Sequence, residues 1–285
     1  MKPFILIITL FIVAGAAFAA PLPDEEVGDS IPTLERPLAL QLYNPPEPQI
    51  VPWRLGVYSA MTLGLVGYCF SRMDDWWGRI YCPFHIKHND WAGDNLAQTD
   101  EVSHAFVSYK IAQAATGLSN WSGFKPGTSR IIGGAFAGSI MLFVEYPVDA
   151  HNLYQGFGYS DMIANSLGIT LALAKNRWPK YLDPIDFRFS IKDLSETPNE
   201  LIAQTFAQND NYIYWLTVNP IDDYPFHFGV GYSANHDNPE FAAEREVYLG
   251  FGTSIAELAG LYNPKWKKSL QTFNFYELSF ALRVH

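Results

Sequence analysis

Cysteine is scarce in this chain of 285 residues, which contains only Cys69 and Cys82. Their spacing matches no zinc or haem motif, so the sequence predicts no bound metal and leaves any cofactor unknown. In an exported chain the two thiols either form one disulfide, worth about 3 kcal/mol, or remain free. No cysteine lies near the amino terminus, so a lipid-modified terminus is not predicted.

Basic residues are also few. The chain has 19 Lys and Arg against 29 Asp and Glu, which gives a net charge of −10. Such a chain repels phosphate backbones, and no cluster of basic and aromatic residues offsets this repulsion. Nucleic acid is therefore excluded as a partner.

Familiar catalytic motifs are absent as well. The sequence has no Gly-x-Ser-x-Gly, no His-Glu-x-x-His and no glycine-rich phosphate-binding loop. The segment HIKH places His85 and His88 close together, but no third metal ligand lies nearby. A solvated loop is the favoured interpretation of this segment.

The amino terminus carries an export signal. Lys2 precedes an apolar run over residues 4–18, and Ala-Phe-Ala at 17–19 forms a cleavage site, which predicts a signal peptide over 1–19. An uncleaved anchor is the alternative, although the run is shorter than the ~20 residues of a spanning helix. Residues 20–52 are rich in proline and predict an extended linker.

Residues 53–180 predict a membrane-associated bundle of four helices, at 54–70, 101–118, 131–146 and about 160–177. Pro147 is expected to end the third helix, and Ser160 or Asp161 to cap the fourth. Gly134-x-x-x-Gly138 favours close approach of two helix backbones. Tryptophans lie near the helix ends, as is typical of a membrane boundary, although they also occur at the ends of soluble bundles.

The carboxyl-terminal region, 181–285, alternates aromatic and polar residues. Strands are predicted at 185–191, 211–218, 226–233, 245–252 and 273–284, with a short helix near 198–208. The expected fold class is therefore α+β: a helical bundle followed by an antiparallel, aromatic-rich sheet. A protein partner is one expectation for this β-rich region.

Polar residues converge at one end of the predicted bundle. Asp100 and His104 lie four residues apart on one helix face, as do Asp161 and Asn165 on another. If consecutive helices are antiparallel, the same end of the bundle also receives the end of the third helix. The candidate catalytic residues are Asp100, His104, Glu145 and Asp161, and the candidate binding residues are Asp149, Ser160 and Asn165.

Two interpretations of these residues stay open. Ionisable groups among apolar helices persist mostly where they pair, bind a ligand or move a proton. An aspartate four residues before a histidine can orient the imidazole and raise its basicity. The structural alternative is that Asp100 and Asp161 cap their helices, His104 is a satisfied core histidine and Asn165 ties helix to helix.

Part of the chain resembles a known family. TDEVSHAFVSY (99–109), then Glu145 and Asp149, then GFGYSDMIANSLG (156–168) resemble the DUF2279 family of uncharacterised envelope proteins, relatives of YfiM-type lipoproteins, and more distantly the VanZ-like membrane family. The likeness covers roughly 91–178. Glu101 replaces a basic residue of the YfiM-type pattern, and Asp149 lies four residues after Glu145 instead of three.

The resemblance implies an envelope location and a shared polar site, but no reaction. Together with the export signal, it predicts a membrane-associated protein on the periplasmic side of the cell envelope, at the outer or the inner membrane, with a membrane lipid or envelope component as partner. We expect an accessory or structural role. The alternative is a hydrolase or transferase acting on an envelope lipid or glycan precursor, with His104 as base.

Overall fold

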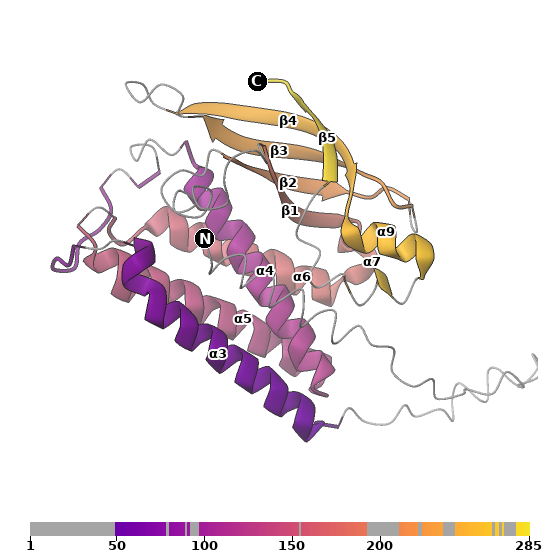
Figure 1. Ribbon diagram of the computed structural model, residues 1–285, viewed down its shortest axis with the longest axis horizontal. Helices are drawn as coiled ribbons and strands as arrows, with labels where there is room; N and C mark the ends of the chain where they lie inside the picture. Colours follow the sequence, from indigo (N-terminus) through magenta and orange to yellow (C-terminus); the bar gives the residue numbers. More distant parts are fainter. Residues whose placement is uncertain are drawn as a thin grey trace, which may run out of the picture.

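The computed structural model describes residues 49–77, 80–88, 90–91, 97–153, 155–192, 211–221, 224–235, 243–263, 266–267, 270 and 278–285. The predicted signal peptide, most of the predicted linker and the short helix predicted near 198–208 lie outside these residues. Figure 1 shows two layers, a sheet above and a group of helices below. The α+β class is therefore confirmed.

Three helices form the helical core. They are α4 (Thr99–Trp121), α5 (Pro126–Phe143) and α6 (Tyr159–Arg177), and α4 packs against both of the others. Glycines permit these contacts. A Cβ at Gly133 would overlap Thr116 of α4, and one at Gly168 would overlap the carbonyl oxygen of Ala105. Gly134, from the predicted Gly-x-x-x-Gly pair, instead meets the side chain of Leu173.

A four-helix bundle is not confirmed. The first helix, α3 (Pro52–Trp77), extends seven residues beyond its predicted end. It is held at its start, where Arg54 Nη1 donates to the carbonyl oxygen of Trp121 (3.2 Å). Further along, Gly64 and Gly67 have no atom of another segment near them, and Leu63 is exposed.

Three helix ends differ from prediction. Pro147 does not end the third helix, because α5 continues through a π-helical turn, η1 (Val144–Val148), into η2 (Asp149–His151). A wider turn accommodates the proline ring, which an α-helix would push against the carbonyl four residues earlier. The N-cap of α6 is Gly158, and that of α4 is Gln98 with φ of 62°. Neither makes a side-chain capping bond, so the predicted caps are wrong.

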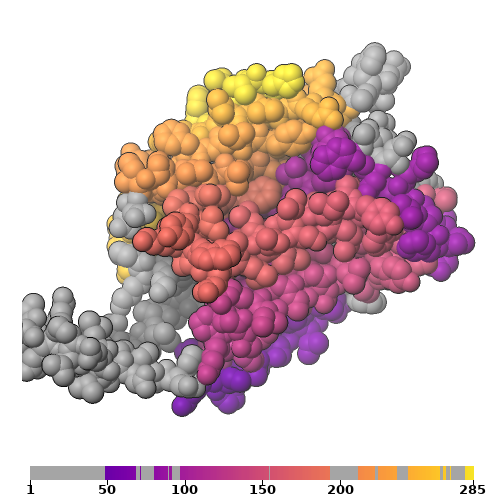
Figure 2. Space-filling model, turned by 180° about the vertical axis from the view of Figure 1, so that it is seen from behind, coloured from indigo at the N-terminus to yellow at the C-terminus, as the bar shows by residue number. Residues whose placement is uncertain are grey.

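One helix among the described residues is long and apolar enough to cross a membrane, by length and composition alone. It covers Pro126–His151, and 28% of its most apolar stretch is buried inside the protein. Figure 2 shows α5 and α6 side by side on one face of the molecule. Exposed apolar side chains on the two helices include Ile131, Leu142, Tyr159, Ile163 and Leu167.

The sheet has five antiparallel strands in the order β1-β2-β3-β4-β5. They are β1 (Ile185–Ile191), β2 (Tyr212–Val218), β3 (His227–Asn235), β4 (Glu244–Thr253) and β5 (Leu278–Arg283). All five lie within or close to the predicted strands. Helix α9 (Ile255–Tyr262), capped by the Ser254 hydroxyl, was not predicted. The short helix α7 (Pro179–Leu182) leads from α6 to the sheet.

The sheet joins the helices through aromatic contacts. Phe106 of α4 packs against Phe187, Phe189 and Tyr214. On the opposite sheet face Trp215 is fully buried, and the strand glycines beside it leave room for its ring. Beyond α4, two rows of paired apolar residues stay exposed: Leu216, Val230, Leu249 and Leu282, then Val218, Phe228, Phe251 and Phe280.

Candidate functional site

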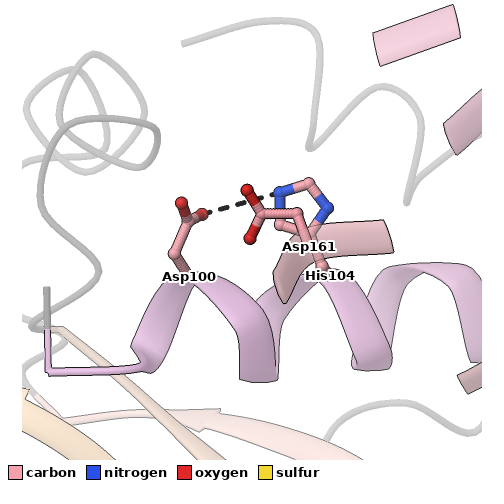
Figure 3. A group of neighbouring side chains, drawn as sticks. All are labelled: Asp100, His104 and Asp161. Atoms are coloured by element: carbon pink, nitrogen blue, oxygen red, sulfur yellow. Dashed lines mark ion pairs between the residues drawn. The ribbon is translucent and has the colours of Figure 1, made fainter. Parts of the chain in front are cut away.

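The first two turns of α4 supply an aspartate and a histidine. Asp100 and His104 lie one turn apart and point the same way (Figure 3), with 3.6 Å between Asp100 Oδ1 and His104 Nε2. Asp161, from the first turn of α6, lies beside them, with one donor atom of each of the three residues within 4.8 Å of the others. The i, i+4 spacing of a helix is what brings the first two side chains together.

The other ring nitrogen of His104 faces Glu145 and Asn165. His104 Nδ1 lies 3.3 Å from Glu145 Oε1 and 3.3 Å from Asn165 Oδ1. Because both neighbours are acceptors, Nδ1 carries a proton. Asn165 Nδ2 donates to Glu145 Oε1 (3.5 Å), and the Gly158 amide donates to Glu145 Oε2 (3.4 Å). Glu145 reaches this position from the π-helical turn η1, in which it is buried.

A lysine from the loop between α3 and α4 enters the same cluster. Lys87 Nζ lies 3.1 Å from Asp100 Oδ2, 3.6 Å from Asp161 Oδ2 and 3.9 Å from Asp90 Oδ1. Asp90 in turn accepts a hydrogen bond from the amide of Ser160 at 2.6 Å. The loop is therefore tied to the starts of both α4 and α6.

Three of the predicted site residues have buried oxygen atoms without a hydrogen-bond partner: Asp161 Oδ1, Asp149 Oδ1 and Ser160 Oγ. Asp149 lies in η2 and makes no direct side-chain bond to the other predicted residues, among the contacts described. The structure thus joins Asp100, His104, Glu145, Asp161 and Asn165 in one network, with Ser160 attached through its backbone. We call this network, with Lys87 and Asp90, the polar cluster.

Negative charge exceeds positive charge in and beside the polar cluster, and burial disfavours the charged forms of Glu145, Asp149 and Asp161. Burial, helped by the nearby charges of Asp161 and Asp149 and opposed by His104, raises the pKa of Glu145 to about 8. Burial likewise raises the pKa of Asp149 to about 7 and that of Asp161 to about 6. For His104, burial lowers the pKa, but Asp100, Asp161 and Glu145 together shift it above its usual value.

Sequence reasoning missed three charged residues in or near the polar cluster. Lys87 lies within HIKH, where only the histidines drew attention, and Asp90 follows it by three residues. The opposite charges of Lys87 and Asp90, three residues apart, were the feature of the sequence that could have indicated their place in the cluster. Glu101 was noted only as a departure from the family pattern, yet it is buried, and burial raises its pKa to about 7.

The polar cluster contains atoms at metal-ligand spacing, although no metal was predicted. One donor atom each from Asp100, His104 and Asp161 lie within 4.8 Å of one another. The HIKH segment (85–88) lies beside the other conspicuous side chain of this loop, Cys82. Cys82 is a free thiol, and its Sγ lies 3.3 Å from His85 Nδ1. Of the two predicted thiol states, the structure therefore has the free one at Cys82.

These features define an α+β protein whose helices enclose a buried acid–histidine cluster. Residues 89–177 match the model of the DUF2279 family, which is described as a predicted periplasmic lipoprotein. The predicted resemblance to this family is confirmed over that segment, whereas the VanZ-like resemblance stays a prediction. Searches of curated proteins and of solved structures found no match.

The family description also agrees with the predicted location. The chain is an envelope-associated protein of the periplasmic side, in association with a membrane. The matched segment contains every residue of the polar cluster except Lys87, which lies two residues before it. The family description does not distinguish between the outer and the inner membrane, so both stay predictions.

Proposed function

We propose that this protein is an accessory, non-catalytic protein of the cell envelope, in which the polar cluster is an ion-pair latch. The observation that carries the proposal is the position of Lys87. Its ammonium group pairs with Asp100 on α4 and with Asp161 on α6. A single cation from a loop therefore fastens the first turns of two core helices.

Closed surroundings support a latch. Lys87 is 9% exposed, Asp161 4% and Glu145 1%. An open surface depression of about 340 Å³ lies instead on the exposed face of α6, lined by Tyr159, Met162, Ile163, Ser166, Leu167 and Thr170. Asp100 and His104 are more open, with side-chain exposures of 20% and 13%.

His104→Gln tests the latch. His104 contacts carboxylates from its own helix and from η1, and removing one partner of a buried charged network costs about 3–5 kcal/mol. We expect His104→Gln to lower the free energy of unfolding by roughly that amount in urea titrations, and to reduce the protein's abundance in the envelope fraction. His285→Ala, at the exposed carboxyl terminus, is the matched control and should change neither.

The hydrolase or transferase with His104 as base is the second candidate, acting on an envelope lipid or glycan precursor. Its support is Glu145, which contacts His104 Nδ1 and would orient the imidazole for proton transfer. Under this alternative, His104→Gln keeps normal stability and abundance but fails to complement a deletion strain. That combination of results would favour the catalytic role of His104 over the ion-pair latch.

We further propose that the outer face of α5 and α6 lies against lipid. Its apolar side chains are uncovered, and α5 with its extension is apolar over a membrane-spanning length. Trp178 at the end of α6 is exposed, as suits an interfacial position.

Site-specific labels test the lipid contact in the full chain. A polarity-sensitive fluorophore is attached to a cysteine replacing Ile163 or Leu167, in a chain with Cys69→Ser and Cys82→Ser. We expect a blue shift on adding phosphatidylcholine vesicles, which do not repel an acidic chain. The matched positions Phe228 and Phe251, also apolar and exposed, lie on the sheet and should not shift. A shift only at the sheet positions would contradict the proposal.

A protein partner for the carboxyl-terminal region stays a prediction. The two exposed apolar rows of the sheet support it, because contiguous apolar surface of this kind marks interaction sites.

A further inference from the structure

We propose that Asp100, His104 and Asp161 form a binding site for a divalent transition-metal ion of the zinc type. This site goes beyond the latch. Lys87 and the His104–Asn165 contact already connect α4 with α6, and a metal ion would add a third connection. The three donor atoms lie within 4.8 Å of one another. Ligands of a tetrahedral zinc ion are about 3.4 Å apart, so small side-chain rotations would close the site.

Asp161 supplies an independent indication of a ligand. Its side chain is 4% exposed, and its Oδ1 atom is buried without a hydrogen-bond partner. Figure 3 shows this carboxylate beside Asp100 and His104, and the three donor atoms lie within 4.8 Å of one another. A buried carboxylate oxygen without a partner is costly, and coordination by a cation removes that cost.

The surroundings of His104 match those of a metal ligand. Glu145 and Asn165 place acceptor oxygens at Nδ1, and Nε2 lies 3.6 Å from Asp100 Oδ1, so a metal ion would bind at Nε2 in place of its proton while Nδ1 keeps its own. Histidines that bind metals usually donate their other ring N–H to a carboxylate or carbonyl oxygen, which fixes the tautomer. Glu145 is placed to do this.

Lys87 Nζ lies 3.1 Å from Asp100 Oδ2 and 3.6 Å from Asp161 Oδ2. A metal ion would therefore bind through the other oxygen of each carboxylate, beside the ammonium group. A dication would add positive charge to a cluster in which the carboxylates outnumber the one lysine. One imidazole nitrogen with two carboxylates suits zinc, whereas magnesium and calcium prefer oxygen ligands alone.

Zinc titration of the full chain, purified without a histidine tag, tests the proposal. Cys82→Ser and His85→Ala are introduced first, because those two side chains form a rival pair 3.3 Å apart. We expect one zinc ion per chain in competition with a chromophoric chelator. Asp161→Asn should weaken binding at least tenfold, and Glu145→Gln about 10-fold or more. His285→Ala is the matched control, and magnesium should not compete.

Absence of one-to-one binding, or equal binding by Asp161→Asn, would overturn the proposal. If a variant fails to fold, the zinc K-edge absorption spectrum of the zinc-loaded chain tests the site instead. That spectrum must show nitrogen and oxygen ligands with one imidazole. Lys87→Met separates this site from the latch. It should retain or strengthen zinc binding, because a positive charge near the metal is removed. The latch itself is measured with a chelator present and does not depend on zinc.

Discussion

Asp186 lies among three cations where the helices meet the sheet. Its Oδ1 atom accepts a hydrogen bond from the Tyr109 hydroxyl at 2.7 Å and lies 3.3 Å from Lys110 Nζ of α4 and 3.8 Å from Lys175 Nζ of α6. Arg188 Nε donates to its Oδ2 (3.3 Å). Burial alone would raise the pKa of Asp186, but the cations outweigh burial and lower it strongly.

This lowered pKa predicts a specific acid sensitivity. The unfolded chain takes up a proton at Asp186 as the pH falls through about 4, whereas the folded chain does not, so stability is lost below that pH. We expect Asp186→Asn to be less stable by about 3 kcal/mol at neutral pH. The difference from wild type should shrink by up to about 1.4 kcal/mol per pH unit below 4. Urea titrations at several pH values measure it, and a constant difference would contradict the account.

Single residues were predictable only where helix periodicity places them. The spacing of Asp100 and His104, and of Asp161 and Asn165, put each pair on one helix face in the sequence and in the structure. Lys87 reaches the cluster from a loop, whose path no periodicity describes. Asp186 was hidden for a similar reason, because alternation in a strand gives its face but not the helix side chains it meets.

At the scale of elements, the helix core depends on glycine where α4 meets α6. A Cβ at Gly168 would overlap the Ala105 carbonyl oxygen and Ser108 Oγ. We expect Gly168→Ala to lower the free energy of unfolding by about 1–3 kcal/mol, since backbone atoms cannot yield easily. Gly138→Ala is the matched control: its nearest neighbour would be 3.9 Å away, so the change should be neutral or stabilising by up to about 1 kcal/mol. Equal effects in thermal unfolding would contradict this assignment.

Strands were predicted more accurately than helix ends. Alternation marks both the extent and the face of a strand, and β1 covers the predicted 185–191. Helix ends depend on local geometry that residue type does not fix. Pro147 signals a stop in sequence but is accommodated in a π-helical turn, and α6 begins after Gly158 rather than after a capping side chain.

At the scale of the whole molecule, the two layers leave two apolar surfaces on different elements. One covers α5 and α6, and the other covers the strands beyond α4. Composition predicted apolar helices and an aromatic sheet, but not which faces remain uncovered. Which faces remain uncovered depends on how α4 packs against α5, α6 and the sheet. Helix α3 is also apolar in sequence, yet most of it stays outside the core.

A double-mutant cycle on Lys87 and Asp161 tests the latch most directly. Lys87→Met, Asp161→Asn and the double variant are unfolded in urea with a chelator present, alongside wild type. Because the two side chains pair inside the protein, 3.6 Å apart, we expect a coupling free energy of about 1.5 kcal/mol or more. Additive effects, within about 0.5 kcal/mol, would show that Lys87 does not fasten the helices through Asp161 and would contradict the proposed role of the polar cluster.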